Sequence, residues 1–242
     1  MSKHEVFSKS ETLLGKRAMR ILAAAKVLVC GMGAVGSYTV EALARGGIGA
    51  LRLVDPDKIE LSNINRQLYA LHSTLGEAKT DTARKRILDI NPDCKVETIQ
   101  DAVASESISQ IASERLSAVI DCMDSPRAKV ELLLRSLELE IPTIVTVSGA
   151  ATRLDPRKIT VGDLFKSSHC PLAKQIRKAL RRILQISGDK TLPSHISCVY
   201  SLEEPRNEQC SELGSFSCLP GIFGLTAAQH AVANILSHPI ST

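Results

Sequence analysis

The sequence has few aromatic residues and no tryptophan. Phe, Tyr and Trp together make up 3% of its 242 residues, whereas 44% are hydrophobic, most of them Ala, Leu, Ile and Val. This composition is typical of helices packed on a β-branched sheet and does not favour an aromatic-rich sandwich. It also argues against a row of aromatic rings on which single-stranded nucleic acid would stack.

Long hydrophobic runs and paired cysteine motifs are also missing. Charges or glycines interrupt each apolar run well before the roughly 18 residues that a membrane span requires, and the first residues lack the apolar stretch of a signal peptide. The seven cysteines are odd in number and no two are separated by two residues, which gives neither a disulfide framework nor a paired-cysteine zinc site. We therefore expect a cytoplasmic protein that binds no membrane and whose cysteines are mostly reduced and buried.

Short apolar runs alternate with helical patterns along residues 26–150. The predicted strands are 26–31, 51–55, 95–99, 117–121 and 142–147, and the predicted helices between them are 34–45, 76–91, 104–114 and 125–140. This alternation predicts an α/β fold: a Rossmann-like, doubly wound, mainly parallel sheet with helices on both faces.

The remainder of the chain continues this pattern without a linker. Predicted elements after residue 150 are an edge strand at 158–162, a helix at 170–186, a strand at 196–202 and a last helix at 219–236. We therefore expect one domain over residues 1–242, because no change in composition divides the chain. Its parts are a helical segment at 1–25, a nucleotide-binding core at 26–150 and a C-terminal extension at 151–242.

A glycine-rich turn follows the first predicted strand. Gly31, Gly33 and Gly36 have the spacing that lets backbone amides and a helix N-terminus approach a phosphate. Asp55 ends the next strand nineteen residues after Gly36, where a carboxylate can accept ribose hydroxyls. A tight turn without a ligand is the alternative, but the combined set favours a nucleotide site.

Polar residues after Asp55 bear on which nucleotide is bound. Two cations and two amide side chains follow Asp55, at Asn63, Arg66, Gln67 and Lys79. These groups suit a triphosphate, whose charge during nucleotidyl transfer needs positive partners, better than they suit the pyrophosphate of a dinucleotide. A dinucleotide-dependent oxidoreductase would explain the glycines and Asp55 but would leave these residues without a role. Taken alone, Arg66 and Lys79 could each be a solvated surface charge.

Asp124 lies just after the fourth predicted strand, at the edge of the sheet where open α/β folds bind ligands. A carboxylate there can hold Mg²⁺ against phosphate oxygens. The same carboxylate could instead cap the helix that begins at Ser125-Pro126. The pattern alone leaves both roles open.

These motifs together resemble the ubiquitin-activating-enzyme-like adenylyltransferases of the ThiF type. The similarity lies in the stretches GMGAVGS, LVDPDKIELSNINRQ, GEAKTDTARKRILDINP and DCMDS, in family order and spacing across residues 26–150. The resemblance implies adenylation of a carboxylate by Mg²⁺-ATP. It assigns Asp55 to the ribose, Asn63, Arg66 and Lys79 to the phosphates, Gln67 to a nearby position and Asp124 to Mg²⁺, with Arg66, Lys79 and Asp124 as catalytic residues.

Within this family, the sequence is most similar to the tRNA threonylcarbamoyladenosine dehydratase branch. Supporting stretches include ARGGIGALRLVDPD, TVSGAATRLDPRKITVGDL, CPLAKQIRKALRR and GSFSCLPGIFGLTAAQ. This resemblance implies ATP-dependent dehydration, or cyclisation, of the modified adenosine, with release of AMP and pyrophosphate. The alternative is an adenylyltransferase that activates the C-terminal glycine of a ubiquitin-like sulfur-carrier protein, although such enzymes commonly carry the paired cysteines that are missing here.

The N-terminal segment departs from the family pattern. Family members usually carry an Arg there that reaches the ATP phosphates, often from the partner subunit of a dimer, whereas this chain has Val6 and Thr12 at the corresponding places. Lys9, Lys16 or Arg17 are the candidate substitutes. The resemblance also implies a homodimer and allows a sulfur-transfer protein as a partner. A scaffold that binds nucleotide and tRNA without turnover is the non-enzymatic alternative.

The predicted helix at 170–186 carries a local excess of positive charge, although the formal net charge of the whole chain is only +4. Its cations fall at helical spacing on one face, opposite an apolar stripe formed by Leu172, Ile176, Leu180, Ile183 and Leu184. This face is a candidate for contacts with tRNA phosphates, and a solvated basic face is the alternative. The cations are Lys174, Arg177, Lys178, Arg181 and Arg182.

A covalent thioester is a conceivable additional step, for which Cys198 and Cys218 are the candidates. Burial of each thiol is the simpler interpretation. His195 and Cys198 have the spacing of a metal pair, but two ligands alone do not predict a zinc site.

Overall fold

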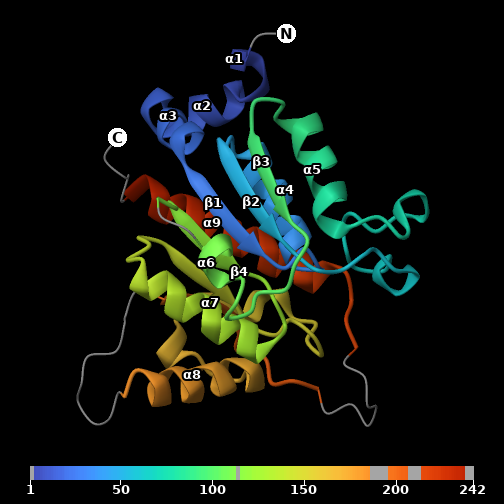
Figure 1. Ribbon diagram of the computed structural model, residues 1–242. Helices are drawn as coiled ribbons and strands as arrows, with labels where there is room; N and C mark the ends of the chain where they lie inside the picture. The colour runs from blue at the N-terminus through green and yellow to red at the C-terminus, as the bar shows by residue number, and fades with distance from the viewer. Residues whose placement is uncertain (1–2, 113–114, 186–195, 207–213, 238–242) are drawn as a thin grey trace.

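The computed structural model describes residues 3–112, 115–185, 196–206 and 214–237 (Figure 1). Its centre is a seven-stranded sheet in the order β3-β2-β1-β4-β5-β7-β6, in which β6 pairs antiparallel with β7 and the other pairs are parallel. The strands are β1 (Lys26–Cys30), β2 (Ala50–Val54), β3 (Lys95–Ile99), β4 (Ala118–Asp121), β5 (Ile144–Val147), β6 (Ile159–Asp163) and β7 (Ile196–Ser201). The predicted Rossmann-like fold is confirmed.

Helices cover both faces of this sheet. One apolar core joins a face of the sheet to α3 (Lys16–Ala24), α4 (Gly36–Arg45), α5 (Lys79–Ile90) and α9 (Cys218–Ser237). The second core joins the opposite face to α6 (Ile108–Ile111), α7 (Pro126–Glu138) and α8 (Pro171–Ile183). Figure 1 shows α9 behind the sheet, α7 in front of it and α8 below α7. None of the described helices combines the length and the hydropathy needed to cross a membrane.

The strand order reverses between β2-β1 and β4-β5. β1 leads to β2 on one side, and it also pairs with β4, which begins the other half of the sheet. In open α/β sheets, ligands bind at the carboxyl ends of the strands beside this point. The glycine turn after β1 and Asp124 after β4 both lie there.

Most differences from the predicted elements concern their ends. The predicted helix at 104–114 is only the short α6, and α4 begins at Gly36, two residues later than expected. In the predicted helical segment at 1–25, the structure places two short helices, α1 (Lys3–Val6) and α2 (Ser8–Leu14), before α3. Residues 186–195, between the predicted helix at 170–186 and the predicted strand at 196–202, lie outside the described residues.

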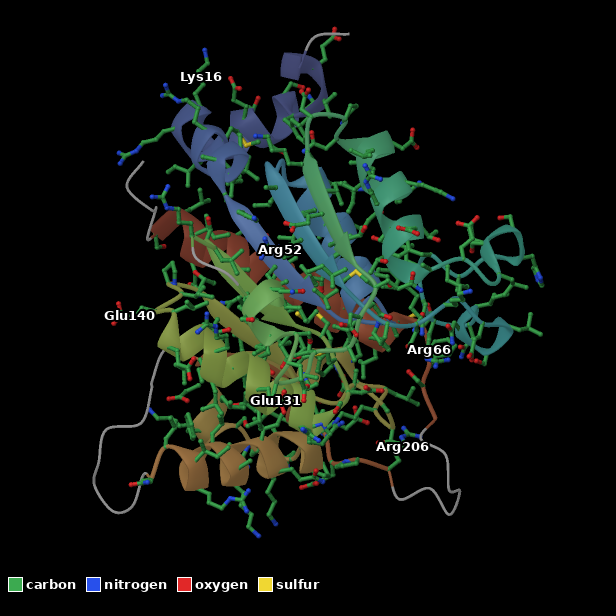
Figure 2. All side chains as sticks on the ribbon, viewed as in Figure 1. Lys16, Arg52, Arg66, Glu131, Glu140 and Arg206 are labelled. Carbon is green, nitrogen blue, oxygen red and sulfur yellow. The ribbon has the colours of Figure 1, made fainter. Side chains whose placement is uncertain are left out.

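The N-terminal helices lie at the edge of the sheet opposite the glycine turn. α3 leads directly into the amino end of β1, and Gly47, just after α4, faces Met19 and Phe7. A cavity of about 690 Å³ beneath these helices is lined by Phe7, Lys16, Met19 and Gly47 among others, and by none of the predicted site residues at the carboxyl ends of the strands. In Figure 2, Lys16 lies at the top of the molecule and Arg66 lies far from it, on the right side below the middle. Lys16 of a chain therefore does not face that chain's own glycine turn.

Candidate nucleotide site

The turn after β1 is tightly packed at two of its three glycines. Gly31 has a φ of +91°, and a Cβ at Gly36 would lie 1.7 Å from the Gly31 carbonyl oxygen, so neither position accepts a side chain without rearrangement. A Cβ at Gly33 would meet only Gln67 Nε2, at 3.8 Å. Gly31 and Gly36 are thus required by the path of the chain, whereas Gly33 leaves open space beside the backbone.

Asp55 is buried beside this loop and held by backbone donors. Met32 N donates to Oδ2 over 2.6 Å, and Asp57 N donates to Oδ1 over 2.8 Å. Burial raises the pKa of Asp55, and the nearby Lys79 ammonium opposes that rise. Because each carboxylate oxygen has two lone pairs, both can still accept a hydroxyl. The contact of Asp55 with a ribose stays a prediction, for which these oxygens are available.

Lys79 begins α5 and projects toward the same place. Its ammonium lies 2.7 Å from Asp57 Oδ2 and 4.0 Å from Asp55 Oδ1. The Lys79 side chain is only 8% exposed, whereas that of Asp57 is 62% exposed. A bound phosphate would therefore compete with a solvated carboxylate for a cation that the fold has already placed.

The segment between β2 and α5 holds the other expected phosphate ligands in different ways. Gln67 is buried and lies beside Gly33. Arg66 is half-buried and donates to Ser62 O over 2.7 Å and to Asn65 Oδ1 over 2.8 Å. Asn63 caps the short 3-10 helix Leu61–Asn63 by accepting from Glu60 N, a structural role that the sequence did not predict.

Asp124 follows β4 at the carboxyl edge of the sheet. Its carboxylate is exposed, and within the described part of the chain no donor contacts it. Ser125, rather than Asp124, is the N-cap of α7 and accepts a hydrogen bond from Ala128 N. The capping alternative for Asp124 is therefore wrong.

The fit of Mg²⁺ at this position depends on the donors that are present. No group of three or more His, Cys, Asp or Glu side chains among the described residues could hold a metal ion by itself. Mg²⁺ commonly takes one or two carboxylates and completes its shell with phosphate oxygens and waters. A single exposed carboxylate at Asp124 suits an ion that arrives with a nucleotide.

A buried ion pair that the sequence did not predict lies beside the site. Lys129 in α7 and Asp121 at the end of β4 lie 2.9 Å apart, and both side chains are 0% exposed. The sequence feature that indicates burial of Lys129 is its position on the apolar stripe of its helix, three residues before Leu132 and four before Leu133.

The cations of α8 do not share one environment. Arg177 is half-buried and donates to Ser167 Oγ over 2.6 Å, and the Arg181 guanidinium lies 5.6 Å from the centre of the Phe165 ring. Lys174, Lys178 and Arg182 are exposed. Ile183 is 47% exposed, so its predicted place in the core-facing stripe is wrong, whereas Leu172 and Leu184 are partly buried and pack against the core as predicted.

The two candidate cysteines differ in access to solvent. Cys198 is 0% exposed, and burial raises the pKa of its thiol to about 12. Cys218 is exposed at the first residue of α9. His195 and Cys210 lie outside the described residues.

We expect Cys198→Ala to retain nucleotide-dependent turnover, because a buried thiol that stays protonated at neutral pH is a poor nucleophile. Iodoacetamide at pH 7.5 should label Cys218 in the folded protein and leave Cys198 unlabelled, as read by peptide mass mapping. Loss of turnover in a folded Cys198→Ala variant would instead require a covalent role for this residue.

The comparisons with known proteins agree with the geometry. The ThiF family model matches residues 7–242. The chain belongs to the ThiF family. The tRNA threonylcarbamoyladenosine dehydratase of Bacillus subtilis is 35% identical over 95% of this ThiF chain and 94% of its own length, and that of Escherichia coli is 34% identical over 96% and 93%. The predicted resemblance to this branch is confirmed.

A solved structure extends the similarity of this ThiF protein to three dimensions. The Escherichia coli dehydratase in complex with ATP superimposes with a TM-score of 0.91 and 35% identity, covering 97% of this chain and 95% of the other.

Proposed function

We propose that this ThiF protein catalyses the ATP-dependent dehydration of threonylcarbamoyladenosine in tRNA, through adenylation of a carboxylate. The observation that carries the proposal is the convergence of Gly33, Asp55 and Lys79 with Asp124 at one edge of the sheet, in a chain similar over nearly its whole length to dehydratases. A dinucleotide-dependent oxidoreductase would not account for Lys79 and Asp124.

Each part of ATP has a matching group. In this proposal Asp55 accepts the ribose hydroxyls, the amides around Gly33 bind a phosphate, Lys79, Arg66 and Asn63 contact the remaining phosphates, and Gln67 lies nearby. When Mg²⁺ is bound through Asp124, it supplies a Lewis acid at phosphate oxygens. Negative charge that develops on the oxygens around the α-phosphorus would face the fixed cations and dipoles of the site, which lowers the barrier of nucleotidyl transfer.

The chemistry begins at the carboxylate of the threonylcarbamoyl group. Its oxygen attacks the α-phosphorus of ATP. The bond from that phosphorus to the bridging oxygen breaks, and pyrophosphate leaves with the electron pair. A carbamoyl nitrogen of the same group then attacks the acyl carbon, loses its proton to solvent and expels AMP. Because ring closure is intramolecular, a high effective concentration accelerates it without a covalent enzyme intermediate.

A second copy of the chain completes the site in this proposal. The N-terminal cations Lys9, Lys16 and Arg17 belong to helices at the opposite edge of the sheet. One of these cations can take the place of the family's N-terminal Arg at the ATP phosphates only if it comes from a partner subunit. We infer a homodimer for this reason. We also infer that residues 1–242 form one domain and that the protein acts in the cytoplasm, where tRNA is available. A sulfur-transfer partner stays a prediction.

The exposed face of α8 is the proposed contact for tRNA phosphates. Changing both Lys178 and Arg182 to Glu should raise the tRNA KM by about tenfold and flatten its salt dependence, because phosphate contacts release counterions. AMP formation at saturating tRNA should change little. The matched control is Gln175→Glu, an exposed change on the same helix that removes no cation. Equal KM values for all three proteins would place the RNA elsewhere.

The proposed function is tested by incubating the purified protein with Mg²⁺-ATP and tRNA with or without threonylcarbamoyladenosine. AMP should form only with the modified tRNA, and its nucleoside should lose the mass of one water. AMP formation with a carrier-protein tail and not with tRNA would favour the sulfur-carrier alternative. ATP binding without AMP formation for any substrate would favour the scaffold.

A further inference from the structure

The buried Lys129–Asp121 pair ties three elements together behind the nucleotide site. Lys129 Nζ donates to Asp121 Oδ2 over 2.9 Å and to the Val147 carbonyl over 2.8 Å. Thr146 Oγ1 donates to the same Asp121 oxygen over 2.7 Å. The pair thereby joins the carboxyl ends of β4 and β5 to the first turns of α7.

Stability alone is a weak reason for such a pair. Removing two charges from water costs free energy that offsets much of their attraction, and apolar replacements of similar volume are often neutral. Lys129 and Asp121 are completely buried. Their charges act on the pKa of the buried Cys30 and Cys198 thiols, which Asp121 raises and Lys129 lowers. The remaining contacts of the pair show what else it does.

The second carboxylate oxygen of Asp121 controls the turn that follows β4. Met123 N donates to Asp121 Oδ1 over 3.2 Å, and Cys122 N donates to Cys30 O over 2.8 Å. On its other side the turn packs against Gly31, where an added Cβ would lie 2.9 Å from the Cys122 carbonyl carbon. The turn is therefore held between the ion pair and the glycine loop, and its next residue is Asp124.

We propose that Lys129 and Asp121 are positioning residues that fix the Cys122–Met123 turn and thereby place the Asp124 carboxylate for the metal-bound phosphates of ATP. Lys129 is closed to solvent, so it acts through this turn and does not touch substrate. The inference rests on the proposed function, because it takes Asp124 as the Mg²⁺ ligand.

Two neutral double variants separate positioning from charge burial. D121N/K129M leaves no unpaired buried charge and keeps an acceptor for Met123 N, whereas D121L/K129M removes that acceptor. We expect both to fold and to bind metal-free ATP within about threefold of wild type. The Mg²⁺ concentration for half-maximal activity should rise about tenfold in D121L/K129M, the factor that one lost hydrogen bond can produce, and less in D121N/K129M.

Calorimetry provides a readout that does not need turnover. The gain in ATP affinity on adding Mg²⁺ should be smaller than in wild type for D121N/K129M and smallest for D121L/K129M. Thr146→Val is a milder variant that removes one hydrogen bond to Asp121, and it should shift the Mg²⁺ dependence in the same direction by about threefold. Ser136→Ala is the matched control, because it removes a buried hydrogen bond of α7 far along the helix from the turn.

Wild-type Mg²⁺ dependence in folded double variants and in Thr146→Val would overturn the inference and leave the proposed function intact. A Mg²⁺ effect of the same size in Ser136→Ala would also overturn it, because the pair would then have only a general structural role. Failure of the proposed function is recognised separately, by the absence of AMP when wild-type protein meets modified tRNA.

Discussion

Replacing Asp124 with Asn is expected to reduce AMP formation by roughly 10²- to 10³-fold, the range observed when one electrostatic contact to a transition state is lost. The fold should survive, since Asp124 is exposed and Ser125 provides the helix cap. Binding of metal-free ATP should change little, because Asp55, Lys79 and the loop amides do not depend on this carboxylate. The measurement is the rate of AMP release during a Mg²⁺ titration at saturating substrate.

The control for this experiment is Asp101→Asn, which changes another exposed carboxylate that follows a strand, here β3. It should leave the rate and the Mg²⁺ dependence unchanged. A folded Asp124→Asn protein with the same Mg²⁺ dependence as wild type would contradict the metal-binding role of Asp124.

Substituting Ala at Gly36 should have the largest effect on stability. The added methyl would lie 1.7 Å from the Gly31 carbonyl oxygen, so the whole loop must move. We expect a loss of about 3 kcal/mol in the free energy of unfolding, which is near the upper end of the usual cost of adding a methyl group to a packed site. The melting temperature should fall by roughly 6 to 12 °C. ATP binding should be lost as well.

Gly33→Ala separates the role of the loop in folding from its role in phosphate binding. Its methyl meets only the Gln67 side chain at 3.8 Å, so the melting temperature should stay within about 2 °C of wild type. The methyl would nevertheless fill the space where a phosphate approaches the backbone, and ATP affinity should fall by more than about tenfold. Differential scanning fluorimetry and calorimetric ATP titration measure both effects. Unchanged ATP affinity in folded Gly33→Ala would show that no phosphate lies against this loop.

The fold was predictable because its sequence signals are local. Compact apolar runs ending at Gly31, Asp55 and Asp121 mark buried parallel strands, and the helices between them follow from apolar periodicity. The same signals place the glycine loop and Asp124 at one edge of the sheet, since the carboxyl ends of parallel strands share an edge.

What the sequence could not predict depends on contacts between distant segments. The partners of Lys129 come from β4 and β5, and Arg177 is partly withdrawn from the basic face of α8 by Ser167, which lies in the preceding loop. Spacing on one helix shows which side chains share a face but not which of them meet another element. Ser125 likewise caps α7 in place of Asp124, a choice between neighbours that the local pattern leaves open.

Carboxylate adenylation is tested most directly by following the oxygen atoms. A tRNA whose threonylcarbamoyl carboxylate carries ¹⁸O should be incubated with Mg²⁺-ATP and the protein, and the released AMP analysed by mass spectrometry. Adenylation transfers one carboxylate oxygen to the α-phosphorus, so each AMP should carry one ¹⁸O from fully labelled substrate. Unlabelled AMP, or ¹⁸O found in released phosphate, would contradict the account.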